Sequence, residues 1–407
     1  MKPDSFTQKR HFIIALGKLL HRCGATAYRL ENHLKNVSRF LDVPGQFIIT
    51  PTAMTFVLYS AEELQEYNFV VRVTPGGIDL SALSRTNQLV DELASGQRTL
   101  AEAIDRLNDI PNKPPPYPAF ATFLAFGASS GAFALLMHTS WQDVFWSTIL
   151  GFLVYLLVLW AEKSNSMANM LEPFSAIVVA ILACAITLFV PTINVPLVIL
   201  SGIIVFIPGL SLTTGLGELA ERHLMSGTAK IMDSIMTMFK LYFGAFLGMT
   251  IGLLLFDKVE YVQPELVPLW TAWIAVLILS LSLVVVFKAR PKHAFWGVLS
   301  GIIAFGVSNW AAQYAGIAIG AFTGAFAIGV YSNLFARFLK APATVVMLQG
   351  LVVLVPGSKV YIGLNSIVTG SAIVQAEQSG SQTFLIFMSL VAGLIFANVA
   401  VRPKNSL

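Results

Sequence analysis

Charged residues are scarce in this chain. Asp, Glu, Lys and Arg make up 12% of its 407 residues, whereas a soluble globular protein has about 25%. With 56% hydrophobic residues and a mean hydropathy of +0.72, the composition excludes a chain that is wholly soluble. Of the 48 charged residues, 25 lie in residues 1–118 and 23 in the other 289. We therefore expect a soluble domain over residues 1–110, followed by a membrane domain.

Several kinds of functional motif are also absent. The two cysteines, Cys23 and Cys184, lie one in each part, so no disulfide framework is expected. No His or Cys pair has metal-ligand spacing, and no glycine-rich phosphate-binding motif occurs. We expect no metal, no cofactor and no enzymatic activity. The net charge of +4 comes from cations interleaved with acids, which does not indicate nucleic-acid binding.

The first 118 residues show the patterns of a small α+β domain. Helical periodicity runs over residues 6–41 with a break near Gly24, and short β-prone runs follow. The run PNKPPPYP predicts a stiff linker over residues 111–118. The expected strands lie at 47–50, 54–59 and 68–73, and two more helices at 79–95 and 99–109.

The rest of the chain contains ten apolar stretches near the length of about 20 residues that a transmembrane helix needs. The first five recur about 148 residues later, which predicts two five-span units, 119–256 and 257–407. An odd number of spans per unit inserts the second copy upside down, giving inverted repeats. The expected spans are 119–137, 143–161, 174–190, 195–214, 235–256, 268–287, 294–312, 316–335, 343–366 and 382–400.

One phrase appears in both units at this offset, GIIVFIPGLSLTTG at 202–215 and GLVVLVPGSKVYIG at 350–363. Its Pro-Gly pair predicts a broken helix in the fourth and ninth spans, because proline removes a backbone donor and glycine relaxes the backbone. Simple kinks are the other interpretation. Paired broken spans indicate a transporter's binding site. The candidate substrate-binding residues are Pro208, Gly209, Ser211, Thr213, Thr214, Pro356, Gly357, Ser358, Lys359, Tyr361 and Asn365.

Charge bias predicts the topology. The first residues, MKPDSFTQKRHF, lack the apolar core of a signal peptide, so the N-terminus is expected in the cytoplasm. The cytoplasmic loops and tail after the first span then carry ten Lys and Arg residues, whereas the external loops carry only Lys258. Both termini are expected inside, and the two breaks are expected to meet near the middle of the membrane.

The polar connector 216–233 offers titratable groups for proton coupling. A carboxylate in a low-dielectric setting takes up protons nearer neutral pH, so we expect Glu218 or Asp233 to reach the central cavity. His223 is the next candidate, with Lys359 as electrostatic counterpart. A solvated loop with local ion pairs is the other interpretation.

Four segments carry a family resemblance: HRCGATAYRLE (21–31), ITPTAMTFVL (49–58), IPGLSLTTGLGELAERHLMSGTAK (207–230) and LVPGSKVYIGLNSI (354–367). They resemble the threonine/serine exporter family. The resemblance implies a ten-span inner-membrane exporter of small hydroxy amino acids, acting by proton antiport. Gly24, Arg29 and Glu31 match positions in the family's soluble motif, where they serve either helix packing or a site.

Alternatives remain open at this point. Split members of that family are linked to dicarboxylate export, for which Lys359 is an anion partner. A different class is a membrane-anchored hydrolase or sensor that uses His11, His21, Cys23 or His33 in the soluble domain. The expected partners are the small-molecule substrate, protons and membrane lipid, and self-association is left open.

Overall fold

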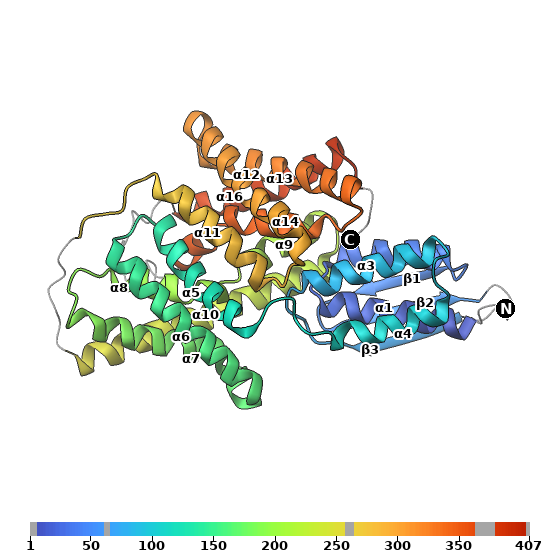
Figure 1. The fold of residues 1–407 in the computed structure, drawn as a ribbon, viewed down its shortest axis with the longest axis horizontal. Helices are drawn as coiled ribbons and strands as arrows, with labels where there is room; N and C mark the ends of the chain where they lie inside the picture. The colour runs from blue at the N-terminus through green and yellow to red at the C-terminus, as the bar shows by residue number, and fades with distance from the viewer. Residues whose placement is uncertain (1–5, 61–65, 257–263, 363–378, 404–407) are drawn as a thin grey trace.

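A computed structural model describes residues 6–60, 66–256, 264–362 and 379–403 of the protein. Figure 1 shows the N-terminal segment, in blue, at one end of a larger helical part. The helical part contains a lower group with α5, α6, α7, α8 and α10 and an upper group from α11 to α16, and α9 lies beside α14.

The N-terminal segment folds as an α+β unit, as the sequence predicts. Its three strands form an antiparallel sheet in the order β1-β2-β3. Alternate residues of β2, including Met54 and Phe56, are buried against Phe12 and Leu16 of α1. The break near Gly24 is confirmed, since this glycine has a φ of +80°. The elements are α1 (Phe6–Arg22), α2 (Ala27–Phe40), β1 (Gly45–Ile49), β2 (Ala53–Tyr59), β3 (Glu66–Arg72), α3 (Leu80–Ala94) and α4 (Leu100–Asp109).

The linker to the membrane part begins with the 3-10 turn η1 (Ile110–Asn112) and leads into α5. The described helices after it are mostly long and apolar. They are α5 (Ala119–Leu136), α6 (Trp141–Lys163), α7 (Asn165–Thr187), α8 (Val195–Gly202), α9 (Gly209–Ala220), α10 (Leu224–Leu255), α11 (Thr271–Val286), α12 (Pro291–Ala315), α13 (Ile317–Leu339), α14 (Thr344–Leu354) and α16 (Ser379–Ala400), with the 3-10 turn η2 (Ile204–Phe206) after α8.

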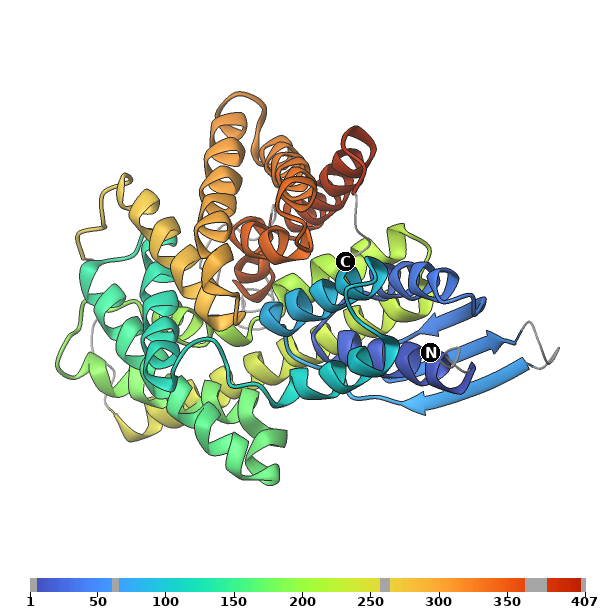
Figure 2. The same ribbon diagram turned by 45° about the vertical axis from the view of Figure 1, so that its right-hand side comes forward.

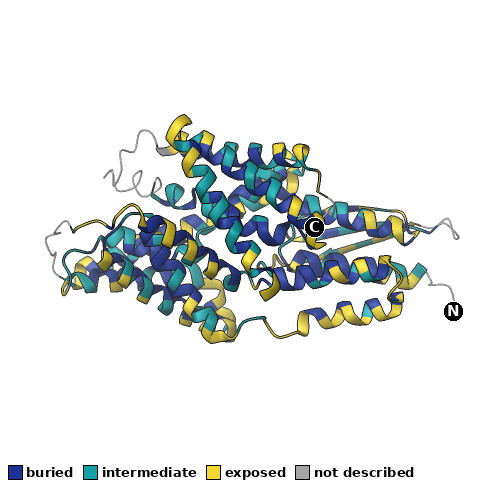
Figure 3. Ribbon diagram, turned by 45° about the horizontal axis from the view of Figure 1, so that its top comes forward, coloured by how far each residue is buried: buried dark blue, intermediate teal, exposed yellow. Residues whose placement is uncertain are grey.

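Within the described residues, eight helices are long and apolar enough to cross a membrane, or nine if the bent pair α8 and α9 counts as one span. The helix α11 has 16 residues, which at 1.5 Å per residue is about 24 Å, short of a hydrocarbon core of about 30 Å. Figure 3 shows exposed positions on the outer helices and buried positions between helices. Many of the exposed positions carry large apolar side chains. Examples are Trp160, Phe243, Leu254, Phe338 and Phe384. The protein is a multi-pass membrane protein.

The connector 216–233 is helical almost throughout, which goes against its interpretation as a solvated loop. The helix α9 runs to Ala220, and α10 begins at Leu224, well before the apolar run that starts near residue 235. A tight turn joins them, with Arg222 at a φ of +65°. The polar residues of α10 extend the helix beyond the apolar stretch, so hydropathy alone placed its start too late.

Candidate functional site at the crossing of two broken helices

Both expected helix breaks are present, and they touch. The segments on either side of the first break, Val195–Gly202 and Ile204–Ala220, are bent by 57°. The second is a shorter interruption within the candidate span Thr344–Ile362, where α14 ends at Leu354 and helix resumes at Gly357. A Cβ placed on Gly209 would lie 3.1 Å from the Cα of Gly357, tighter than ordinary van der Waals contact. The two breaks therefore meet as expected, while their depth in the membrane stays a prediction.

The contacts at the crossing are reciprocal. A Cβ on Gly209 would meet Val355 and Gly357, and a Cβ on Gly357 would meet Ile207 and Gly209, the residues 148 positions earlier. Such an exchange of equivalent contacts is what a two-fold relation produces. A second pair of contacts repeats at an offset of 149 residues: Gly244 packs on Pro173 and Ala176, and Gly393 packs on Phe322 and Ala325.

A cavity of about 550 Å³ opens at this crossing. The volume is within the range of about 300–1,000 Å³ seen for small-molecule sites. Two carboxylates, Glu172 of α7 and Asp233 of α10, line it, and no Lys, Arg or His is among its described lining residues. Apolar side chains make up about half of the lining residues, and five uncharged polar ones also line it: Ser129, Ser211, Ser234, Thr237 and Ser358.

Some of the candidate binding residues line the cavity, and others do not. Thr213 is buried, and its hydroxyl donates to the carbonyl of Gly209 at 3.1 Å. Thr214 bonds the carbonyl of Ser211 in the same way. Tyr361 is buried in the apolar cluster that includes Tyr242. Those that line the cavity are Pro208, Gly209, Ser211, Gly357 and Ser358.

Three further candidates are not among the described residues that line the cavity. Pro356 is buried beside the crossing, and Lys359 is half-buried; neither is among the residues lining the cavity. Asn365 lies outside the described residues. Of the candidates for proton coupling, only Asp233 lines the cavity.

Glu218 instead joins the soluble domain to the membrane part. It is 2% exposed, forms an ion pair with Lys230, and accepts a hydrogen bond from the backbone N–H of Ala27 at 3.0 Å. Ala27 is the first residue of α2, and Thr26 before it provides no side-chain cap. Glu218 therefore caps a helix of the soluble domain, where a negative charge also favours the helix dipole.

The family motif at 21–31 makes most of the remaining contacts of this junction. Glu31 lies 3.5 Å from His223 Nδ1 and also accepts from the N–H of Ile49 at 3.2 Å. Arg29 donates to Thr344 Oγ1 at 2.6 Å and contacts Met347 Sδ at 3.2 Å, both in α14. Burial lowers the pKa of Arg29, although a guanidinium stays charged in proteins. The motif thus docks on α9, α10 and α14, the helices around both breaks. In Figures 1 and 2, the yellow-green segment of α9 and α10 accordingly lies beside the blue soluble domain.

The loop between β3 and α3 brings the soluble domain to the cavity itself. Gly77 and Ile78 line the cavity. A Cβ on Gly76 would overlap the carbonyl oxygen of Arg22, so the loop packs tightly on the end of α1. The N–H of Leu80 donates to the carbonyl of Phe287 at 3.0 Å, which fixes the loop to the end of α11.

Sequence reasoning did not select Glu172 or Ile78 as site residues. Glu172 precedes Pro173 within α7, whose first turns are polar, so it fell outside the expected apolar span. Ile78 carries no polar signal, and its place is set by contacts between distant segments. The sequence had one usable hint: Glu172 is one of few carboxylates near the apolar stretches.

The soluble domain offers little support for a cysteine nucleophile. Burial raises the pKa of the Cys23 thiol to about 12, with Asp79 adding to the shift. A thiol of this kind holds almost no thiolate at neutral pH, and the thiolate is the nucleophile. Burial also lowers the pKa of His21. Within the described ranges, no group of three or more His, Cys, Asp or Glu side chains is placed to hold a metal ion.

Comparison with known proteins identifies relatives over most of the chain. The chain is 25% identical to the pheromone-regulated membrane protein 10 of Yarrowia lipolytica, over 86% of this chain and 30% of that protein. It is 26% identical to the protein of the same name in Eremothecium gossypii, over 86% of this chain and 48% of that protein. An uncharacterised protein of Schizosaccharomyces pombe is 24% identical, over 97% of this chain and 54% of that protein. The chain thus spans about half or less of the length of these relatives. No solved structure matches.

Two family models match in succession. One, for the threonine/serine exporter ThrE, matches residues 11–252, which include the soluble domain and the first broken helix. The other, described as "Threonine/Serine exporter, ThrE", matches residues 272–400, which include the second. The two matches together cover both breaks and both sides of the cavity, and the chain belongs to the threonine/serine exporter family.

Proposed function

We propose that this protein is a secondary exporter of small hydroxy amino acids, threonine and serine, coupled to protons. The observation that supports it most directly is the acidic cavity at the crossing of the two broken helices. An amino-acid zwitterion carries one ammonium and one carboxylate, and the cavity offers a partner for each. Glu172 and Asp233 provide negative charge for the ammonium. The helix starts at Gly209 and Gly357 offer first-turn amides for the carboxylate.

The same cavity argues against a dicarboxylate as the substrate. Two carboxylates in the lining repel a dianion, and no described lining residue is cationic. Lys359, the anion partner that a dicarboxylate would need, is not among those lining residues. The hydroxyls of Ser211 and Ser358 suit a substrate hydroxyl. We therefore favour threonine and serine over succinate-like substrates.

We further propose that the membrane part has ten spans arranged as two inverted five-span repeats. The bent pair α8 and α9 supplies the fourth span, and α11 the short sixth. The reciprocal glycine contacts and the repeated packing at constant offset support this arrangement. Alternating access then consists of rocking of the two units about the crossing, with the chain in the inner membrane and both termini in the cytoplasm.

Asp233 is our candidate for the proton carrier, because it faces the cavity that the substrate enters. Glu172 shares the cavity and is the second candidate. Glu218 and His223 then act indirectly, by holding the soluble domain against the helices that move. Because substrate and proton share Asp233, binding of one displaces the other, and this competition couples their movement in opposite directions, as in an antiporter.

Flux measurements in proteoliposomes test the proposal. We expect labelled threonine and serine, but not succinate, to be transported, with a rate that depends on an imposed pH gradient. Asp233→Asn is expected to remove the gradient dependence and weaken apparent substrate affinity about tenfold, as loss of a charged hydrogen-bond partner does. Glu172→Gln is expected to weaken affinity with less effect on coupling.

The matched control is Glu162→Gln, which removes an exposed carboxylate at the end of α6 outside the cavity lining. It should transport like the parent protein. Faster transport of succinate than of threonine would contradict the substrate assignment. Full gradient dependence in both cavity variants would contradict the coupling assignment.

A further inference from the structure

A second pocket lies between the soluble domain and the membrane part, apart from the central cavity. Its volume is about 170 Å³, several times the roughly 30 Å³ that one water occupies in the liquid. Four cations line it: Arg85 of α3, Arg106 of α4, Lys113 of the linker, and Arg290 directly before α12. Three come from the soluble domain and its linker, and Arg290 comes from the membrane part.

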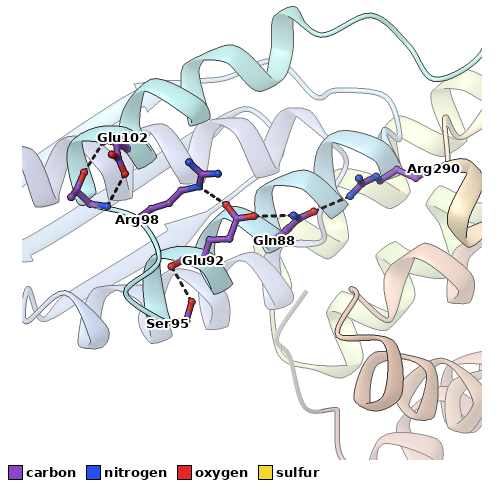
Figure 4. A network of polar contacts seen from close by, with 7 residues as sticks. Gln88, Glu92, Ser95, Arg98, Glu102 and Arg290 are labelled. Carbon is purple, nitrogen blue, oxygen red and sulfur yellow. Dashed lines mark hydrogen bonds and ion pairs between the residues drawn. The ribbon is translucent and has the colours of Figure 1, made fainter.

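The single acid of this pocket does not balance them. Glu92 forms an ion pair with Arg98, and it also accepts a hydrogen bond from Gln88 Nε2 at 2.8 Å. Arg290 lies on the other side of Gln88 from Glu92, and its guanidinium donates to Gln88 Oε1 at 3.1 Å (Figure 4). Among the described residues, none of the four lining cations has an ion-pair partner within 4.0 Å. Glu92 also interacts with Arg106 through their charges, so one carboxylate faces four cations and the pocket has a net positive charge.

Two of these cations act on one another through their charges. Arg85 and Arg290 are both partly buried. Burial, and then the neighbouring charge of Arg85, lower the pKa of Arg290. Like charges that are partly removed from water repel one another, and a bound anion relieves this repulsion. Paired guanidiniums are also the groups best suited to bind a phosphate in bidentate fashion.

The position of the pocket indicates the class of ligand. Arg290 is the residue before a candidate span, and Lys113 lies six residues before the first residue of another, Ala119. Cations at the ends of membrane spans lie at the depth of lipid headgroups. We propose that this pocket binds a phosphate group, with an anionic phospholipid headgroup as its source, and that the bound group clamps the soluble domain to the second membrane unit.

Thermal unfolding of the full chain in a non-ionic detergent tests the proposal at constant ionic strength. The probes are short-chain phosphatidylglycerol, phosphatidylcholine of the same chain length, and inorganic phosphate. We expect saturable stabilisation by phosphatidylglycerol and little by phosphatidylcholine. The variant Arg85→Gln/Arg290→Gln should bind phosphatidylglycerol about fivefold more weakly for each charge removed.

The matched control is Arg39→Gln/Arg72→Gln, which removes two exposed cations of the soluble domain outside the pocket. It should keep the parent's affinity for phosphatidylglycerol. If the first double variant fails to fold, the single variant Lys113→Gln, at an exposed linker position, replaces it. Saturable binding of inorganic phosphate that is lost in the pocket variant, without binding of the lipid, assigns the site to a free phosphate. No saturable effect of either probe, or equal loss in the pocket and control variants, overturns the proposal.

Discussion

At the scale of single residues, Glu218 shows how one carboxylate can serve two segments of the chain. Its side chain is buried, and it holds both Lys230 of α10 and the first N–H of α2. A buried ion pair is stabilising only when both charges keep their partners. The surrounding contacts of Glu31 with His223, and of Arg29 with Thr344, extend the same junction.

We predict that Glu218→Gln weakens the contact between the soluble domain and the membrane part, while the cavity keeps both of its carboxylates. Loss of the charge leaves Lys230 partly buried and unpaired, which we expect to lower the free energy of unfolding by about 2 kcal/mol. Hydrogen exchange should become faster at the N–H of Ala27 and its neighbours at the start of α2. Amide exchange and thermal unfolding measure the two effects.

Glu221→Gln is the control, because Glu221 follows at the end of the same helix. Among the described residues its side chain forms no hydrogen bond or ion pair, and its charge acts on Arg29 and not on the N–H of Ala27. Equal changes in exchange for the two variants would show that Glu218 does not cap α2. A retained dependence of transport on the pH gradient in Glu218→Gln would agree with Asp233 as the proton carrier.

These residue contacts mark the limit of what the sequence could predict. Glu218 and Ala27 are separated by 191 positions, and Arg29 and Thr344 by 315. Nothing in local spacing pairs residues so far apart, so sequence reasoning assigned Glu218 to the cavity and left Arg29 and Glu31 without a partner. Asp233 does line the cavity, because α10 starts early and runs past the crossing, and its role stays a prediction.

At the scale of secondary-structure elements, the crossing depends on the absence of side chains at two glycines. A Cβ on Gly209 would lie 2.6 Å from Val355 Cγ1 and 3.1 Å from the Cα of Gly357. Backbone cannot yield as a flexible side chain does. We therefore regard the glycine of each Pro-Gly pair as the residue that permits contact, and the proline as the residue that ends the preceding helix.

We predict that Gly209→Ala and Gly357→Ala each reduce transport about tenfold or more while the protein still folds. Overpacking costs about 1–3 kcal/mol, and about 1.4 kcal/mol corresponds to a tenfold change in an equilibrium constant. Replacing both residues of either Pro-Gly pair by alanine should have at least the same effect, since it restores continuous helix. Transport per folded molecule is the quantity to compare.

Gly217 offers a control within the same helix as Gly209. A Cβ placed there meets nothing within 4 Å, so Gly217→Ala should fold well and transport normally. The prediction fails if Gly209→Ala transports as well as Gly217→Ala. In that event the Pro-Gly pairs are kinks without a role in transport.

Elements whose formation is governed by local pattern were the ones the sequence predicted well. The three strands and four helices of the soluble domain follow from alternation, periodicity and turn residues such as Gly24. Of the ten expected spans, nine coincide with candidate spans of the described residues if α8 and α9 count as one, and the sixth coincides with the shorter α11. The helix α10 begins about eleven residues before the expected span, because amphipathic turns extend it. Hydropathy detects contact with lipid, and it does not detect where a helix ends in water or against another domain.

At the scale of the whole molecule, several loops gather on the side of the soluble domain. The turn between α9 and α10, the end of α11 and the start of α14 all contact it through Glu218, Phe287 and Thr344. The end of α16 joins the same side indirectly. Asn333 of α13 donates to the carbonyl of Val401 at 2.7 Å, and α13 ends a few residues before Thr344.

This gathering supports a topology in which both ends of the chain share one side of the membrane. The loops involved follow the expected fourth, sixth and eighth spans, which are the loops rich in Lys and Arg. The positive-inside rule places such loops in the cytoplasm. We therefore predict that reporters fused at residues 1 and 407 both report a cytoplasmic location.

A reporter inserted after Gly316 provides the opposite control. Gly316 lies in the exposed turn between α12 and α13, where a Cβ would meet nothing within 4 Å, so an insertion there should be tolerated. With an odd number of spans between it and the cytoplasmic start, this turn should report the outside. An external signal from either terminus, or a cytoplasmic signal from the Gly316 insertion, would rule out two inverted five-span units. The reciprocal contacts of Gly209 and Gly357 would then require a two-fold relation between parallel repeats, with its axis along the membrane normal.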